Sequence, residues 1–89
     1  MQEKQIQIIN KLGLHARAAT KLANLSNRFS SRIEVVAKGK ATDAKSIMSL
    51  MLLAASKGTD ITLRTDGEDE EAAMGALIEL INNRFDEAE

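Results

Sequence analysis

The chain has 89 residues, of which 44% are hydrophobic and 28% are charged, and its formal net charge is −1. This size and composition predict one globular domain with a small core and argue against intrinsic disorder. Because the charge is near zero and the only aromatic residues are two Phe, nucleic acid and anionic lipid are excluded as expected partners.

The chain contains no Cys and one His, so disulfides, thiolate metal sites and His-cluster metal sites are excluded. We expect no cofactor and no metal. The first ten residues lack the apolar core of a signal peptide. The longest apolar run, residues 47–55, falls short of the roughly 20 residues that cross a bilayer. We therefore expect a cytoplasmic protein without membrane insertion.

The first half of the chain predicts two strands, a helix and a third, short strand. Apolar and polar residues alternate over residues 3–9, which indicates a half-buried strand. Apolar residues at helical spacing follow over residues 16–29. Alternation returns over residues 33–37, and a turn at Gly39 leads to a short strand over residues 40–44.

The second half predicts a helix, a strand and a longer helix. Ser46 precedes the apolar run "IMSLMLLAAS", which fits a short helix that ends near Gly58, since glycine commonly follows a helix C-terminus. Alternation over residues 61–64 indicates a fourth strand. The acidic run "EDEE" then suits a helix first turn, and apolar spacing extends that helix to about Arg84.

This order, β-α-β-β-α-β-α, predicts an α+β fold with one sheet and with all helices packed against one face of that sheet. The opposite face should be open to solvent, because the alternate strand positions carry polar side chains: Gln5, Gln7, Glu34, Thr62 and Arg64.

His15 is the first candidate functional residue, although a lone His at a helix start is more often only a polar surface residue or a weak cap. A helix that begins at Ala16 places His15 at the N-cap, beside backbone N–H groups that have no intrahelical partner. These groups and Arg17 form a site for an anion such as a phosphoryl group. They also favour a neutral, nucleophilic imidazole over imidazolium.

Nothing else in the chain completes an enzyme of a common kind. The sequence has no Gly-rich nucleotide loop, no second His to act as a base and no recognisable metal site. A nucleophile without its own substrate pocket suggests a carrier that takes a group from one protein and gives it to another.

Two segments match a known family. "GLHARAA", residues 13–19, resembles the G-[LM]-H-A-R-P-A motif of HPr, the histidine-containing phosphocarrier of the bacterial phosphotransferase system. "KSIMSLMLLAASKGTDITL", residues 45–63, resembles the second HPr motif. The resemblance covers residues 3–85 and includes the sugar-type HPr and the nitrogen-related NPr. It implies an open-faced β-sandwich, with a four-stranded antiparallel sheet and three helices on one face.

The resemblance also implies a role for each motif residue. His15 would accept a phosphoryl group, on Nδ1 in the family, from enzyme I charged by phosphoenolpyruvate. It would pass this group to the A domain of a sugar permease or of its nitrogen-related paralogue, and Arg17 would hold the group meanwhile. Ala18 stands where the motif has proline, and we expect altered pre-organisation of the first turn, not lost function. The protein would be a monomer and no enzyme in its own right.

Ser46 is a favoured N-cap residue, worth about 1 kcal/mol, and the resemblance adds regulatory phosphorylation by an HPr kinase/phosphatase. The helix that follows is apolar nearly all round, so part of it should be exposed. Leu50 and Leu53 suit the core. The resemblance places the others beside His15 as a docking surface: Ile47, Met48 and Met51, with Ala16, Arg17, Thr20 and Lys21 on the rim.

Two other function classes stay open. A regulatory HPr-like protein would act by docking alone, with phosphorylation as its switch, but the intact pair of His15 and Arg17 favours transfer. A small-ligand-sensing α+β domain would share the same elements, but the sequence shows no polar cluster suited to line a cleft.

Overall fold

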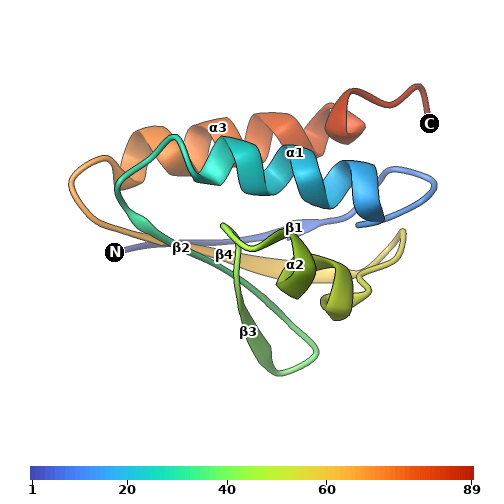
Figure 1. Cartoon of the computed structure of the whole chain (residues 1–89), viewed down its shortest axis with the longest axis horizontal. Coiled ribbons are helices and arrows are strands. Elements are labelled where there is room, and N and C mark those ends of the chain that lie inside the picture. Colours follow the sequence, from blue (N-terminus) through green and yellow to red (C-terminus); the bar gives the residue numbers. More distant parts are fainter.

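A computed structural model describes residues 1–89 of the chain. It contains four strands, three α-helices and one 3₁₀ turn (Figure 1). Their bounds, in chain order, are β1 Gln2–Gln7, α1 Ala16–Ser26, β2 Arg32–Ala37, β3 Lys40–Asp43, α2 Ile47–Leu53, β4 Asp60–Asp66, α3 Glu70–Asn82 and η1 Arg84–Asp86.

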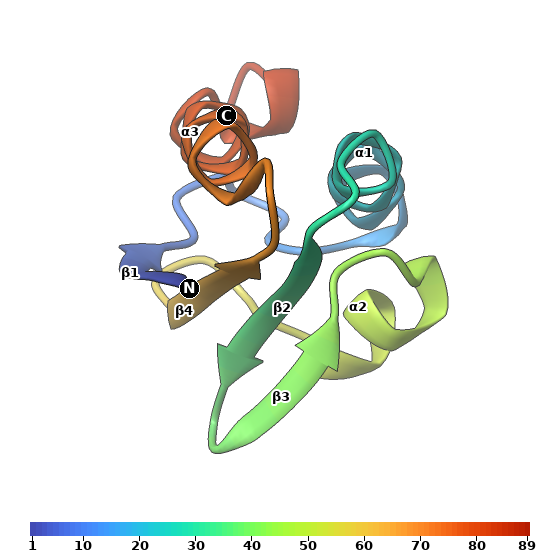
Figure 2. The ribbon, with the colours of Figure 1, turned by 90° about the vertical axis from the view of Figure 1, so that its left-hand side faces the viewer.

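The four strands form one antiparallel sheet in the order β1-β4-β2-β3. Leu63 of β4 lies opposite Lys4 of β1 on one side and Val35 of β2 on the other. Figure 2 shows α1, α2 and α3 on one side of this sheet, while the other side carries no helix. The predicted fold class, an open-faced sandwich with helices on one face, is confirmed.

The alternating strand pattern separates the two faces of the sheet. Inward-facing residues of β2 and β4 are buried: Ile33, Val35, Ala37, Ile61, Leu63 and Thr65. They pack against the apolar faces of the helices, which contribute Leu22, Leu50, Leu77 and Ile81 among others. The polar alternates predicted for the open face are not buried. The strand bounds differ from the predicted ones by two residues or fewer, as Asp60–Asp66 does from residues 61–64.

Two predicted helix ends are wrong. Helix α1 ends at Ser26, three residues before the predicted Phe29, although Phe29 still packs against the core. Helix α2 ends at Leu53, and the residue that stops it is Ala54, in the left-handed conformation with φ 52°. Gly58 therefore does not terminate the helix, because the tight packing of the following segment turns the chain earlier.

The C-terminal end of α3 also departs from the prediction. The helix ends at Asn82, and Arg84, Phe85 and Asp86 then adopt positive φ angles of 56°, 53° and 63°. Helical spacing assigned Phe85 to a face of this helix. Phe85 is fully buried as expected for a core residue, but a left-handed turn places it there. No helix of the chain is long and apolar enough to cross a membrane.

Candidate functional site

The loop before α1 is fixed by a close approach between two segments. Gly13 has φ +67°, and a Cβ at this position would lie 2.6 Å from the carbonyl oxygen of Ala55. The next residue, Leu14, is buried and donates its N–H to the same oxygen at 2.8 Å. Only glycine fits here, so this contact sets where the following residue, His15, begins α1.

His15 occupies the N-cap of α1, with φ −79° and ψ −176°. Its carbonyl accepts the first intrahelical hydrogen bond from Ala19 N–H at 2.8 Å. Its ring nitrogen Nδ1 accepts the backbone N–H of Arg17 at 3.4 Å, a long contact. The lone pair of Nδ1 therefore points at the positive end of the helix. Ala18, in place of the motif's proline, is the third helical residue, one before the first intrahelical donor, and is fully buried.

The other ring nitrogen has a different environment. Nε2 lies 2.5 Å from Oε2 of Glu87, and the other oxygen of this carboxylate accepts Nδ2–H of Asn10 at 3.0 Å. The amide of Asn10 and then the imidazole of His15 hold the pKa of the Glu87 carboxyl below its usual value. Because a carboxylate accepts the proton of Nε2, Nδ1 is left as the unprotonated nitrogen. The sequence argument had counted only positive neighbours of His15 and missed this carboxylate.

Arg17 is exposed, and its guanidinium forms no ion pair. It therefore keeps all of its donors for a ligand. A guanidinium beside free helix N–H groups suits phosphoryl oxygens, which accept planar, charge-assisted hydrogen bonds.

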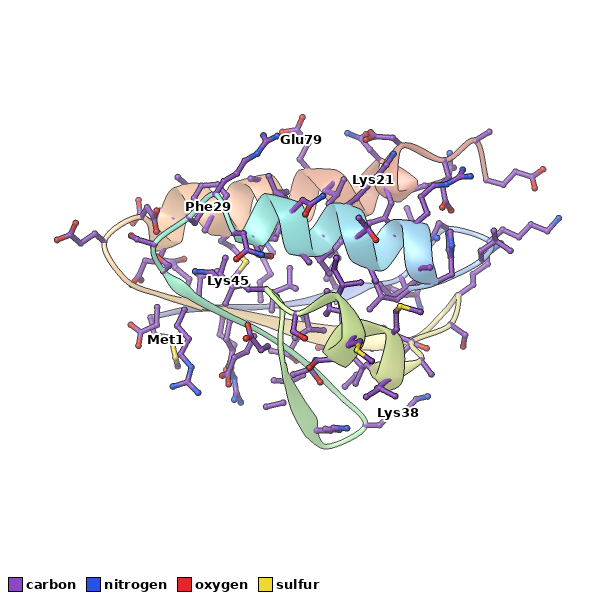
Figure 3. The ribbon with its side chains drawn as sticks, viewed as in Figure 1. Met1, Lys21, Phe29, Lys38, Lys45 and Glu79 are labelled. Carbon is purple, nitrogen blue, oxygen red and sulfur yellow. The ribbon has the colours of Figure 1, made fainter.

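The other rim residues lie on the same helix with unequal freedom. Ala16 is exposed, and Thr20 donates its hydroxyl to the carbonyl of Ala16 at 2.7 Å. Lys21 donates its Nζ to the carbonyl of Phe85 at 3.0 Å and lies 3.5 Å from the carboxylate of Asp86. Figure 3 shows its side chain extending from α1 toward the end of α3. Lys21 thus anchors the C-terminal segment.

Ser46 occupies the N-cap of α2, where its Oγ accepts the N–H of Ser49 at 3.2 Å. On the helix that follows, Leu50 and Leu53 are buried, whereas Met48, Met51 and Ile47 are 74%, 44% and 37% exposed. Helices α1 and α2 pack against each other. We call Ile47, Met48 and Met51 the apolar patch.

Two further exposed apolar side chains, Leu12 and Leu52, were not among the predicted site residues. Leu52 belongs to the same short helix, and the all-round apolar character of that helix was the signal that could have included it. Leu12 lies in the loop between Asn10 and Gly13, where the sequence gives no periodicity to read.

An open-faced fold with a single imidazole at a helix N-terminus, and an arginine without an ion pair two residues further, fits a histidine-based group carrier. The comparisons agree. Residues 2–83 match the family model described as the phosphotransferase system HPr component phosphorylation site. The chain belongs to the HPr family, the phosphocarriers of the phosphotransferase system, which carry the phosphoryl group and are not catalysts.

The similarity to curated relatives covers nearly the whole chain. The phosphocarrier protein HPr of Cupriavidus necator is 53% identical over 89 residues, which are 100% of both chains. That of Pseudomonas aeruginosa is 54% identical over 96% of each chain. The phosphocarrier protein NPr of Shewanella violacea is 46% identical, over 97% of this chain and 94% of its own.

Solved structures share the fold at full length. An HPr crystal structure from Thermoanaerobacter tengcongensis superposes with a TM-score of 0.96 at 44% identity and covers 100% of both chains. The Bacillus subtilis catabolite repression protein Crh, described as a swapped dimer, has a TM-score of 0.75 at 39% identity, with 94% of this chain and 97% of its own covered.

Proposed function

We propose that His15 accepts a phosphoryl group on Nδ1 from phospho-enzyme I and passes it to the A domain of a permease or of a nitrogen-related paralogue. The observation that supports this proposal is that the two ring nitrogens of His15 have different contacts. Nε2 is engaged by Glu87 at 2.5 Å, whereas Nδ1 faces the helix N-terminus through a long contact of 3.4 Å. A phosphoryl group on Nδ1 can replace that contact.

Arg17 and the first turn of α1 serve as the counter-charge. The attached group carries negative charge, and the unpaired N–H groups of a helix N-terminus attract it. The guanidinium of Arg17 has no competing partner. Its loss removes a charge-assisted contact, which is worth about 1.5–3 kcal/mol.

The apolar patch is the docking surface in this proposal. Its methionines adapt to differently shaped partners, as a carrier with one donor and several acceptors requires. The patch begins next to Ser46, and a phosphate on Ser46 adds about −1.5 to −2 charges at the patch. We therefore include Ser46 as a regulatory site for an ATP-dependent HPr kinase/phosphatase, and we expect the protein to act as a monomer in the cytoplasm.

Phosphorylation of the purified chain tests this function. We expect phosphoenolpyruvate and enzyme I to give one acid-labile phosphate on the wild-type chain and none on His15→Ala, with both chains folded. Separate reactions with the sugar-type and the nitrogen-type enzyme I identify the donor. Acid-labile phosphate on His15→Ala would contradict the assignment.

A regulatory role through docking alone is the second candidate, because the chain is 39% identical to Crh, whose description names catabolite repression. The same reaction separates the two functions. A chain that takes no phosphate from either enzyme I but binds partners after modification of Ser46 would be such a regulator.

A further inference from the structure

The segment after α3 reverses direction and returns to the N-terminal end of α1. Arg84, Phe85 and Asp86 make this reversal with successive positive φ angles, a conformation that L-residues disfavour. The fully buried ring of Phe85 holds the turn in place, and the N–H of Glu87 closes it on the carbonyl of Arg84 at 2.9 Å.

Contacts on both sides then hold the segment against the site. Lys21 of α1 donates to the carbonyl of Phe85 at 3.0 Å. On the other side, Nζ of Lys11 lies 3.3 Å from the carboxylate of Glu89, and the backbones of these two residues are also hydrogen-bonded. The side chain of Glu87, between these anchors, is only 11% exposed.

Asn10 completes a chain of contacts that ends on the imidazole. Its buried side chain donates Nδ2–H to the carbonyl of Gly13 at 2.8 Å and to Glu87 at 3.0 Å. One carboxylate oxygen is therefore committed to Asn10 and the other faces Nε2 of His15. The carboxylate has no rotational freedom to leave the ring without breaking the bond to Asn10.

We propose that Glu87 is a positioning residue for His15, which holds the Nε2–H tautomer and balances the charge that the ring acquires on phosphorylation. This inference rests on the proposed function. It adds a member of the site that lies outside both sequence motifs, in a segment that a left-handed turn brings back across the molecule.

The transfer step shows why a carboxylate at this place helps. The lone pair of Nδ1 forms the bond to phosphorus, and the bond between phosphorus and the donor atom breaks, with its electron pair leaving on the donor. The ring keeps its Nε2 proton and becomes a phosphoimidazolium with one positive charge. Glu87 lies 2.5 Å from the protonated nitrogen, so it stabilises the charge that appears during transfer.

Other charges around the ring come from two further segments. Arg17 on α1 and Lys11 on the preceding loop are positive, while Asp86 and Glu89 accompany Glu87 on the C-terminal segment, and these residues line one open depression. Helix α2 carries no charged side chain. Among these charged side chains only Glu87 is hydrogen-bonded to the imidazole. Glu79, which is exposed on α3 and forms no ion pair, is therefore a matched control for the removal of an acidic charge.

Glu87→Gln tests the tautomer directly. An amide has one acceptor and one donor group. The amide oxygen stays with the donor Nδ2–H of Asn10, and the NH₂ group then faces Nε2 and favours the opposite tautomer. We expect the ¹⁵N chemical shifts of His15, in the neutral ring, to report Nδ1–H in Glu87→Gln. They should report Nε2–H in the wild type and in Glu79→Gln.

Phosphoramidate, a small donor that needs no docking, tests the consequence for the chemistry. Its P–N bond breaks and ammonia leaves as Nδ1 bonds to phosphorus. We expect Glu87→Gln to take up phosphate roughly 10- to 100-fold more slowly than the wild type, as for the loss of one charge-assisted hydrogen bond. Glu79→Gln should react at the wild-type rate, and the backbone NMR spectra of all three chains should show the same fold.

An unchanged tautomer in Glu87→Gln, or an equal loss of rate in Glu79→Gln, would overturn this assignment. A switched tautomer with the wild-type rate would also overturn it. Failure of the proposed function is a separate result, because the wild-type chain would then take no phosphate on His15 from enzyme I, whatever its tautomer.

Discussion

Helices α1 and α2 begin in the same way but with opposite consequences. At α2, the hydroxyl of Ser46 bonds the N–H of Ser49 at 3.2 Å and occupies the helix N-terminus. At α1, the ring of His15 makes a longer contact of 3.4 Å with the N–H of Arg17. A serine cap completes its helix, whereas the imidazole leaves the helix N-terminus accessible to another ligand. We propose that this difference leaves the start of α1 free to hold a phosphoryl group.

The largest effect is expected when α1 receives the same cap as α2. His15→Ser should abolish acid-labile phosphorylation by enzyme I. Stability should stay within about 1 kcal/mol of the wild type, since serine is a better N-cap than most residues. Phosphate uptake and the urea midpoint measure the two effects. Loss of the fold in this variant would show that the ring is structural.

Removal of the free guanidinium should give the next largest effect. Arg17→Ala should slow single-turnover phosphate uptake by roughly one to two orders of magnitude, which corresponds to a charge-assisted contact of about 1.5–3 kcal/mol. Arg17 is exposed and unpaired, so stability should not change. Unchanged uptake would mean that the helix N-terminus alone holds the phosphoryl group.

The body of α2 supplies a matched pair of variants. Leu50 is fully buried and Met48 is 74% exposed. Leu50→Ala should cost about 2–5 kcal/mol of unfolding free energy, whereas Met48→Ala should cost less than about 0.5 kcal/mol and weaken binding of enzyme I. Urea unfolding and binding titration measure the pair. A large loss of stability in Met48→Ala would place this residue in the core.

Helix α3 begins in a third way. The side chain of its N-cap residue, Asp69, forms hydrogen bonds with another segment and none with its own helix. Its carboxylate accepts the N–H groups of Ser30 and Ser31 at 2.9 and 3.0 Å, and also the hydroxyl of Ser31. The hydroxyl of Ser31 and the N–H of Ser30 lower the pKa of Asp69 to about 2.

A lowered carboxyl pKa makes stability depend on pH. The unfolded chain binds this proton near pH 3.9, so the contribution of Asp69 is present above about pH 4 and is lost as the pH falls toward about 2. Asp69→Asn should therefore be less stable than the wild type at pH 7, and the difference should shrink over that acid range. Thermal midpoints from pH 7 to pH 2 measure it, and a constant difference would refute the linkage.

A charge at the cap of α2 should give the smallest effect. Ser46→Asp should raise the Michaelis constant for enzyme I severalfold, because it adds negative charge beside the apolar patch. Stability should stay unchanged or rise by up to about 0.5 kcal/mol through the helix dipole. Ser49→Asp is a control, because it adds the same charge within the helix, two residues beyond Ile47, and not at the N-cap. An unchanged Michaelis constant would remove Ser46 from regulation.

Local patterns were enough to predict the sheet, the helix-covered face and both N-caps. Alternation at Ile33 and Val35 depends only on neighbours in the sequence, and so does the cap at Ser46. The errors occur where contacts with distant segments of the chain determine the local structure. Ala54 ends α2 because the following segment packs against Gly13, and Phe85 enters the core through a turn that no periodicity encodes.

The residues of the candidate site also fall into these two groups: some are placed by local sequence and others by contacts with distant segments. The first motif places His15 at the N-cap of α1 and Arg17 in its first turn, and this placement follows from local sequence. Glu87 could not be found in that way, because 72 residues separate it from His15. Lys21 was expected on the rim, but its contact with Phe85 likewise depends on the reversed C-terminal segment.

The close approach at Gly13 has a consequence for how this sequence can vary. A methyl group there would meet the backbone of Ala55 and Ser56 at 2.6 and 2.8 Å, and backbone cannot rotate away as a side chain can. Position 13 therefore accepts one residue only, although it carries no reactive atom. In a population of variants selected for activity, it should be as invariant as position 15, because His15 is the proposed carrier of the phosphoryl group and Gly13 sets the position of His15.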